Sequence, residues 1–264
     1  MMPIDNIQRM EPVLTGPEGR FAEIDLARLQ RLGMVTHDGA RTGVAEDFRI
    51  IKRPLLRSTR AADGQPVRHS NLIVVTSALP GEGKTYCAIN LAMSMAMERD
   101  TTVLLVDADV ARPSLLAALG LAPRVGLMDV LLEDKLDLSD VILRTNVPAL
   151  SILPAGRRTR HATELLASRG MTRLLEDIAN RYPDRIVIFD SPPLLITTEA
   201  SVLAAQMGQV VLVVEAERTT HSAVREALRQ LESCPNVNLI YNKTASFSGA
   251  GYYGYYDQEA PCSR

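Results

Sequence analysis

The sequence is poor in cysteine, in aromatic residues and in any excess of charge. Its 264 residues include three cysteines, no tryptophan and four phenylalanines, and the formal net charge is -2. The cysteines are odd in number, widely spaced and without a CxxC pair, which predicts reduced thiols rather than a disulfide framework or a zinc site. A chain this close to neutral has no general attraction for phosphate backbones, so we expect no nucleic-acid partner. The densest basic run, "GRRTRH" at 156–161, is short, and a solvated loop is the favoured interpretation.

Long hydrophobic runs are also absent. No segment approaches the roughly 18 uninterrupted apolar residues of a membrane span. The first residues, "MMPIDNIQRMEPV", lack the apolar core of a secretion signal. We therefore expect a cytoplasmic protein that associates with membranes only through a partner.

From residue 71 onward, short apolar runs rich in β-branched residues alternate with helical stretches. Continuous apolar runs are typical of parallel strands that are covered on both faces. The alternation predicts a doubly wound, mainly parallel α/β sheet. Strands are expected at 72–77, 102–107, 150–155, 185–191, 210–216 and 237–243. Helices are expected at 84–98, 113–119, 126–132, 163–181, 199–206 and 220–233.

The two ends of the chain lack this alternation. Residues 1–45 are polar and show helical spacing only over 21–33, which predicts a partly flexible N-terminal arm. An amphipathic helix is expected at 44–56. Residues 244–264 have no apolar periodicity and hold four of the seven tyrosines, so we expect a flexible tail. The folded domain is accordingly expected at 46–243.

A phosphate-binding loop is indicated directly after the first predicted strand. The segment "ALPGEGKT" at 78–85 fits the pattern GxxxxGK[ST], except that Ala78 replaces the first glycine. Gly81 and Gly83 allow backbone N–H groups to surround a phosphate, and the next helix points its positive end at it. Lys84 and the Thr85 hydroxyl then suit the β and γ phosphates and Mg²⁺. A plain glycine-rich turn is the alternative, but strand, loop, GKT and helix follow in the required order.

Carboxylates end two further predicted strands. Asp107 and Asp109 follow the run "LLV", and Asp190 follows "IVIF". The carboxyl ends of parallel strands are where open α/β sheets bind their ligands. One carboxylate there can hold Mg²⁺ and another can accept a proton from an attacking hydroxyl. Helix capping or a surface-loop role is the alternative for each residue alone.

Together, "ALPGEGKT", "LLVDAD" and "IVIFDSPP", followed by a tyrosine cluster, resemble the bacterial protein-tyrosine kinases over residues 46–256. The resemblance implies a P-loop fold of the deviant Walker superfamily, with ATP and Mg²⁺ as cofactors. It makes Asp107 the base that acts on a tyrosine hydroxyl. The implied catalytic residues are Lys84, Asp107 and Asp109, the metal ligands are Thr85, Asp109 and Asp190, and the nucleotide-binding residues are Gly81, Glu82, Gly83, Lys84, Thr85, Tyr86 and Asn242. For Asn242, a turn-stabilising role remains open beside contact with adenine.

The same resemblance implies a substrate and an assembly. The substrate is the chain's own tail, phosphorylated at Tyr252, Tyr253, Tyr255 and Tyr256. The assembly is a homo-oligomeric ring built by an early helix, in which Glu46, Arg49 and Lys52 match the family's Glu-x-x-Arg-x-x-Arg pattern except for the last arginine. From spacing alone, an ordinary surface pair between Glu46 and Arg49 is an equal alternative.

The segments "FRIIKRPLL" and "DADVARPSL" resemble the corresponding segments of the stand-alone tyrosine autokinases of exopolysaccharide loci associated with exosortase systems. That subgroup implies a role in regulating exopolysaccharide synthesis and export. The implied partners are a membrane-embedded polysaccharide chain-length or co-polymerase protein, which activates the kinase, and a tyrosine phosphatase. The chain would then lie peripherally at the inner membrane through its activator.

Two other functions stay open at this point. A partitioning or cell-division-site ATPase of the same superfamily would carry an extra lysine near the start of the loop, where Leu79 stands. Such a switch also has no reason to end in clustered tyrosines. A non-catalytic, nucleotide-binding regulator of a membrane partner is the second alternative, because Ala78 and Ala111 replace residues that the family pattern holds as glycine and a basic residue.

Overall fold

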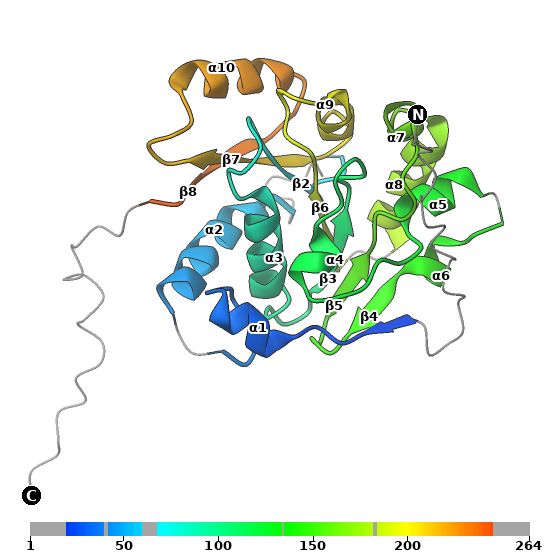
Figure 1. Ribbon diagram of the computed structural model, residues 1–264, viewed down its shortest axis with the longest axis horizontal. Helices are drawn as coiled ribbons and strands as arrows, with labels where there is room; N and C mark the ends of the chain where they lie inside the picture. The colour runs from blue at the N-terminus through cyan, green and yellow to red at the C-terminus, as the bar shows by residue number, and fades with distance from the viewer. Residues whose placement is uncertain (1–19, 40–41, 60–67, 134, 182–183, 245–264) are drawn as a thin grey trace, which may run out of the picture.

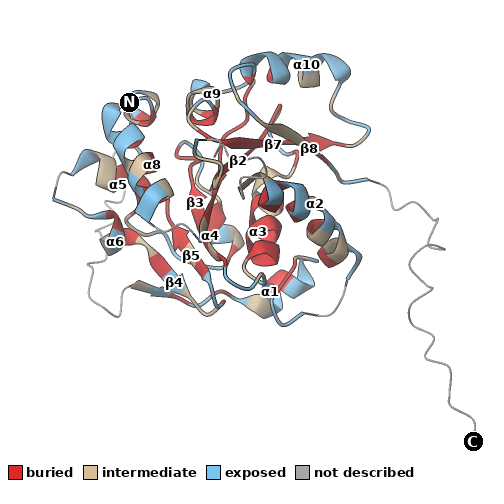
Figure 2. Cartoon of the chain, turned by 180° about the vertical axis from the view of Figure 1, so that it is seen from behind, coloured by how far each residue is buried: buried red, intermediate tan, exposed pale blue. Residues whose placement is uncertain are grey.

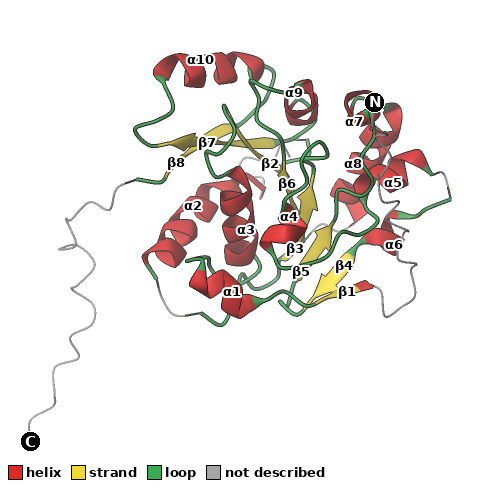
Figure 3. Cartoon of the chain, viewed as in Figure 1, coloured by secondary structure: helices red, strands yellow, loops and turns green. Residues whose placement is uncertain are grey.

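In the part of the chain that the structure describes, eight strands form one sheet with helices on both faces (Figures 1 and 3). This computed structural model describes residues 20–39, 42–59, 68–133, 135–181 and 184–244. The strands are β1 (Phe21–Ala22), β2 (Leu72–Ser77), β3 (Thr102–Asp107), β4 (Leu143–Thr145), β5 (Leu150–Leu153), β6 (Arg185–Asp190), β7 (Gln209–Glu215) and β8 (Val237–Asn242). The helices are α1 (Leu26–Arg31), α2 (Gly43–Thr59), α3 (Lys84–Met95), α4 (Leu115–Ala118), α5 (Leu127–Leu132), α6 (Leu138–Val141), α7 (Ala162–Leu166), α8 (Arg169–Arg181), α9 (Thr198–Ala204) and α10 (His221–Gln230).

The strand order is β1-β4-β5-β3-β6-β2-β7-β8. Every neighbouring pair is parallel except β4 with β5, which is antiparallel. The predicted doubly wound, mainly parallel sheet is therefore confirmed. The strand that precedes the glycine-rich loop, β2, lies near the centre of the sheet between β6 and β7.

The strands at the centre of the sheet are apolar because both of their faces are covered. All residues of β2 and β7 are buried, and two hydrophobic clusters lie on opposite faces of the sheet. Helices α1 to α4 contribute to one cluster, and helices α5 to α10 contribute to the other. Figure 2 shows the burial concentrated in the strands and in α3, which begins at the glycine-rich loop. At roughly 25 cal/mol per Å² of apolar surface, this burial stabilises the platform that carries the loop.

The predicted strands are present, and so are most of the predicted helices. One predicted helix, 163–181, is divided into α7 and α8. The Ser168 hydroxyl accepts a hydrogen bond from the Met171 N–H, which caps the second helix and separates it from the first. Strands β1 and β4 were not predicted, because strands of two and three residues carry no recognisable sequence pattern.

The structure places the start of the folded domain upstream of residue 46. Strand β1 pairs with β4, so residues 20–39 belong to the sheet and its core rather than to an arm. Leu29 is fully buried, and the Val35 N–H donates to Oδ1 of Asn90, a buried residue of α3. The remainder of the predicted arm, residues 1–19, lies outside the described residues, as does the predicted tail from residue 245.

Helix α2 turns its predicted assembly residues in different directions. Glu46 and Arg49 are partly exposed and form an ion pair of 2.8 Å with each other. Lys52 is instead 3% exposed, and its Nζ donates to the Ser94 carbonyl at 2.5 Å and pairs with Glu98 at 2.7 Å. Lys52 therefore binds α3 and the turn after it within its own chain, and it is not available to a neighbouring subunit as the sequence analysis expected.

None of the helices in the described residues is long and apolar enough to cross a membrane. The two cysteines in this part of the chain, Cys87 and Cys234, are free thiols, as predicted.

Candidate active site

The glycine-rich loop and three carboxylates meet at one edge of the sheet. Strands β2, β3 and β6 run parallel, so their carboxyl ends lie together. Asp107 at the end of β3 is the direct register partner of Asp190 at the end of β6. Lys84 and Thr85 begin α3, directly after the loop that follows β2. The fold thus brings together the main residues that the sequence analysis selected.

The loop has the backbone conformation of a phosphate cradle. Gly81 and Gly83 have φ values of 87° and 98°, in the left-handed region that residues with a side chain avoid. A Cβ on Gly83 would also lie 2.2 Å from Nδ2 of Asn242. Glycine is required at position 83 both by the turn and by the close approach of β8. The helix then begins at Lys84, with its first N–H groups directed toward the loop.

The buried side chain of Glu82 stabilises the conformation of the glycine-rich loop. Its side chain is buried at 2% exposure, accepts the Leu79 N–H at 2.6 Å, and accepts the hydroxyl of Thr219. The Glu82 carboxylate therefore faces the protein, so any nucleotide contact at this position belongs to the backbone. Thr219 follows β7 and was not selected from the sequence, because nothing in the local pattern marks its contact with a loop 137 positions away.

Two residues at the end of β8 donate hydrogen bonds to backbone carbonyls of the glycine-rich loop. Asn242 donates from Nδ2 to the Glu82 carbonyl at 2.8 Å, and Lys243 donates from Nζ to the Gly81 carbonyl at 2.7 Å. The side chain of Asn242 is thus engaged in holding the loop, which matches the turn-stabilising alternative. Lys243 was also missed from the sequence.

Lys84 and Asp109 form the ion pair at the centre of the site. Lys84 Nζ lies 2.9 Å from Oδ2 of Asp109, and both side chains are largely buried. The second oxygen of Asp109 accepts the Arg112 N–H at 3.1 Å, which fixes the orientation of the carboxylate. The Thr85 hydroxyl lies 3.3 Å from the Ser114 hydroxyl in the loop after β3. Lysine and threonine therefore face the carboxylates rather than solvent.

Asp107 and Asp190 are buried carboxyls with unused oxygens. Asp107 is 1% exposed and Asp190 is fully buried. Oδ1 of Asp107 and both carboxylate oxygens of Asp190 have no hydrogen-bond partner among the described residues, whereas Oδ2 of Asp107 accepts the Leu115 N–H at 3.2 Å. A buried carboxylate oxygen without a partner is costly, and such groups commonly belong to ligand or catalytic sites.

Burial raises the pKa values of both groups. Loss of solvent raises the pKa of Asp107 to about 7, and the neighbouring charge of Asp190 adds to this effect. Burial likewise raises the pKa of Asp190 to about 7, even though the charge of Lys84 and the nearby Thr85 hydroxyl act in the opposite direction. A carboxyl with a pKa near neutrality can exchange a proton at physiological pH, as a general base must.

The donor set fits a magnesium ion bound together with phosphates. Thr85, Asp109 and Asp190 supply oxygen atoms, which are the ligands that Mg²⁺ prefers. In the described residues no group of three or more acidic, histidine or cysteine side chains forms a complete metal cage. Mg²⁺ sites in nucleotide-binding proteins usually combine one or two carboxylates with substrate phosphates and water.

Tyr86 does not face this site. Its hydroxyl donates to the Gly33 carbonyl at 3.1 Å, and its ring packs against the core on the side of α1 and α2. Burial raises the pKa of this phenol. Of the predicted nucleotide-binding residues, Tyr86 instead links the start of α3 to the N-terminal segment.

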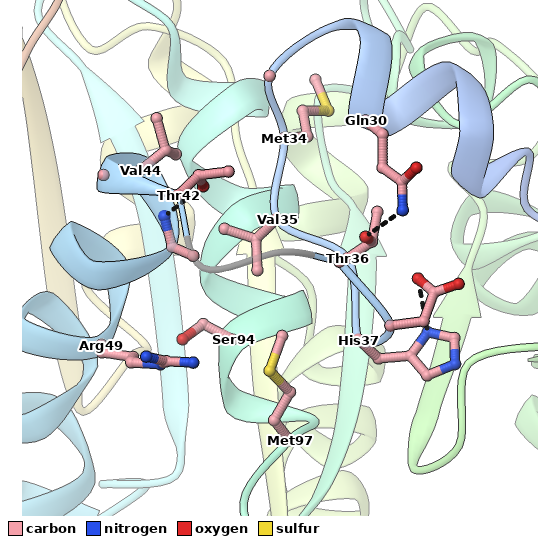
Figure 4. A pocket seen from close by; sticks show the side chains of 15 residues that line it. Gln30, Met34, Val35, Thr36, His37, Thr42, Val44, Arg49, Ser94 and Met97 are labelled. Carbon is pink, nitrogen blue, oxygen red and sulfur yellow. Dashed lines mark hydrogen bonds and ion pairs between the residues drawn. The ribbon is translucent and has the colours of Figure 1, made fainter. Parts of the chain in front are cut away.

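A separate cavity of about 520 Å³ lies between the N-terminal segment, α2 and the end of α3 (Figure 4). Its lining includes Arg49, Ser94 and Met97 but no residue of the glycine-rich loop. The cavity is therefore distinct from the phosphate cradle, although Arg49, one of the predicted assembly residues, borders it.

Comparison with known proteins agrees with this site. A family model described as an AAA domain matches residues 70–242, which include the loop and all three strand-end carboxylates. The tyrosine-protein kinase YwqD of Bacillus subtilis (strain 168) is 34% identical over 191 residues, which cover 71% of this chain and 79% of that protein. The chain belongs to the bacterial protein-tyrosine kinase family. Its P-loop fold and its family were thus both predicted from sequence.

This chain spans only part of the length of several similar proteins. The succinoglycan biosynthesis transport protein ExoP of Rhizobium meliloti (strain 1021) is 32% identical over 238 residues, 88% of this chain but 29% of that protein. Two relatives from Ralstonia are covered over only 23% and 21% of their length. Among solved structures, the chimeric protein CapA2B2 shares 26% identity with a TM-score of 0.66, covering 81% of this chain and 97% of that one.

Proposed function

We propose that this chain is an Mg²⁺- and ATP-dependent protein-tyrosine kinase whose substrate is its own C-terminal tyrosine cluster. The observation that carries the proposal is the set of buried, partnerless carboxylate oxygens of Asp107 and Asp190 beside Lys84 and the glycine-rich loop. Membership of the tyrosine-kinase family supports the same activity.

In this proposal the loop binds ATP through its backbone N–H groups and through Lys84. Lys84 exchanges its ion pair with Asp109 for the β and γ phosphate oxygens, which leaves Asp109 free for the metal. Thr85, Asp109 and Asp190 hold Mg²⁺, which supplies neutralisation of the phosphate charge when it is bound. Glu82, Asn242 and Lys243 keep the loop in position during the exchange.

Asp107 acts on the acceptor tyrosine. Oδ2 is held by the Leu115 N–H, so Oδ1 is the atom that takes the proton of the phenol. A pKa of about 7 suits this role, because the carboxylate is populated at neutral pH and still binds a proton firmly. Since Asp107 is 1% exposed, the acceptor reaches it only after the residues that cover it move aside.

The acceptors in this proposal are Tyr252, Tyr253, Tyr255 and Tyr256, which lie outside the described residues. They enter the site of a neighbouring subunit in a ring. A membrane-embedded polysaccharide co-polymerase activates the kinase at the inner membrane, and a tyrosine phosphatase reverses the reaction. The similarity to ExoP, a protein named for succinoglycan biosynthesis transport, supports a role in regulating exopolysaccharide synthesis and export.

The test is to mix two variant chains, neither of which can phosphorylate its own tail, with labelled ATP and Mg²⁺. One chain carries Lys84→Met with its tyrosines intact, and the other keeps an active site but ends at residue 244. We expect label on the tyrosines of the Lys84→Met chain, because transfer runs between subunits. Absence of label in the mixture, with label in the wild-type chain, would show transfer within one chain. Absence of label on tyrosine in both, with and without the activating partner, would refute the kinase.

A further inference from the structure

The basic run 156–161 leaves the sheet beside the proposed catalytic base. Strand β5, which precedes it, lies parallel to β3 with Leu153 opposite Val106. The next residue of β3 is Asp107, so the chain after β5 emerges about one strand spacing, roughly 5 Å, from the end of β3. Ligands of open α/β sheets approach this edge.

A buried carboxylate holds the first part of this loop in place. Asp129 of α5 is 3% exposed and accepts the N–H groups of Gly126, at 2.8 Å, and of Arg157, at 3.2 Å. Its other oxygen accepts Nε of Arg157, whose guanidinium also contacts Glu133. Gly156 has a φ of 83°, and a Cβ there would lie 2.3 Å from Oδ2 of Asp129. The segment is therefore an exposed loop, as expected, and contacts with Asp129 hold its first part in a defined turn.

Two arginines follow the anchored part and have no protein partner. Arg158 and Arg160 are exposed, and neither makes a hydrogen bond or an ion pair with the residues that the structure describes. Arg157, by contrast, is neutralised by Asp129 and Glu133. Two guanidinium groups without a partner among the described residues thus lie on the loop that follows β5, the strand next to β3.

The chain's own tail has the complementary charge. Asp257 and Glu259 follow directly after Tyr256, and no basic residue occurs between Tyr252 and Pro261. Guanidinium groups bind carboxylates through paired N–H donors, which adds orientation to attraction. The acidic residues of the tail therefore carry the charge that Arg158 and Arg160 attract.

We infer that Arg158 and Arg160 determine substrate specificity by docking the acidic residues that flank the acceptor tyrosines. The inference rests on the proposed function, because it names the substrate class of that site: a tyrosine followed by carboxylates. The arginines bind and orient the peptide and take no part in the transfer step. Their removal weakens peptide binding and leaves the turnover of bound peptide unchanged.

The test measures binding and transfer separately. The probe is a fluorescent peptide of residues 249–264 with Cys262→Ser, and a second peptide also carries Asp257→Asn and Glu259→Gln. The protein is the full chain with these two neutral substitutions in its own tail, so that its tail does not compete. The variant pair is Arg158→Ala/Arg160→Ala and, as a control with the same loss of charge, Arg225→Ala/Arg229→Ala on the exposed face of α10.

We expect the loop variant to bind the acidic peptide about 5-fold or more weakly at low salt, and to raise KM with kcat unchanged. The control variant and the neutral peptide should show no such difference. Arg158→Glu/Arg160→Glu should prefer a peptide with Asp257→Lys and Glu259→Lys, which a merely structural loop would not produce.

Equal binding of the acidic peptide by the loop variant and the control would overturn the inference. So would loop-dependent binding of phosphatidylglycerol vesicles without loop-dependent binding of the peptide, because the arginines would then recognise a lipid surface. Loop-dependent peptide binding without any phosphate transfer would support the docking site and refute the proposed kinase activity, so the two failures are distinguishable.

Discussion

Asp107 and Asp190 are the two buried carboxylates at the centre of the proposed active site. Adjacent parallel strands place them side by side, and burial raises the pKa of each to about 7. Such an arrangement destabilises the chain when both groups are ionised, since a buried charge without a partner is costly. A cation bound with phosphate removes that cost, so ligand binding and the stability of the site are coupled.

Replacing Asp190 with asparagine should stabilise the metal-free chain at alkaline pH. Because the pKa values of both groups are raised from 3.8 in the folded state, the folded chain holds more protons than the unfolded chain between about pH 4 and pH 7. The free energy of unfolding therefore falls as pH rises through this window. Asp190→Asn removes one of the two contributions, for a gain of about 1–3 kcal/mol at pH 8 and almost none at pH 4. Thermal unfolding at the two pH values measures this.

The exposed Asp38→Asn is the matched control and should leave the pH dependence of unfolding as it is in the wild type. An Asp190→Asn chain that is equally or less stable than the wild type at pH 8 would contradict the buried, partnerless environment assigned to Asp190.

Helix α2 shows how one element combines two roles. Its inward face packs Phe48 and Leu55 into the core. Its outer surface carries the pair Glu46 and Arg49, and Arg49 borders the cavity of Figure 4. Lys52 interrupts the apolar inward face but is satisfied by Glu98 and the Ser94 carbonyl. Of the three positions that match the family pattern Glu-x-x-Arg-x-x-Arg, the first two are therefore exposed, whereas the last, Lys52, is buried and contacts its own chain.

Lys52→Met should consequently affect stability, whereas Arg49→Ala should affect assembly. Lys52→Met removes the 2.7 Å ion pair between Lys52 and Glu98 and the hydrogen bond to the Ser94 carbonyl, and should lower the free energy of unfolding by about 1–3 kcal/mol. Arg49→Ala removes an exposed pair and should cost less than about 0.5 kcal/mol, while reducing the size of the assembled particle. Chemical denaturation and light scattering measure the two effects. A Lys52→Met chain that is as stable as the wild type but fails to assemble would indicate that Lys52 lies in the subunit interface.

For the molecule as a whole, the proposed product is also a regulator of assembly. Each phosphotyrosine adds roughly 1.5 to 2 negative charges. Four such groups in one tail repel the tails of neighbouring subunits strongly enough to loosen a ring. Phosphorylation of the tail would thus change the oligomeric state of the protein.

We therefore expect the phosphorylated chain to form smaller particles than the dephosphorylated one. A chain with phenylalanine at positions 252, 253, 255 and 256 should stay large after incubation with ATP, which separates the effect of tail charge from that of nucleotide binding. Light scattering before and after phosphatase treatment measures this. Equal particle sizes in all states would contradict the proposal that phosphorylation of the tail controls assembly.

The sequence predicted the sheet and the core of the site well because both follow local patterns. Continuous apolar runs identify strands covered on two faces, and the glycine-rich loop and strand-end aspartates have fixed positions relative to those strands. What it missed depends on contacts between distant parts of the chain. Thr219 and Lys243 contact the loop from 137 and 162 positions away, and the burial of Lys52 depends on Ser94 and Glu98.

The central claim is transfer of phosphate from ATP to tyrosine by this chain. The most direct measurement is mass spectrometry of the full chain after incubation with ATP and Mg²⁺, together with the amount of ADP formed. We predict phosphate on tyrosines among positions 252 to 256, in proportion to ADP, and none in a Lys84→Met chain. Formation of ADP without phosphotyrosine would contradict the account and show an ATPase switch instead.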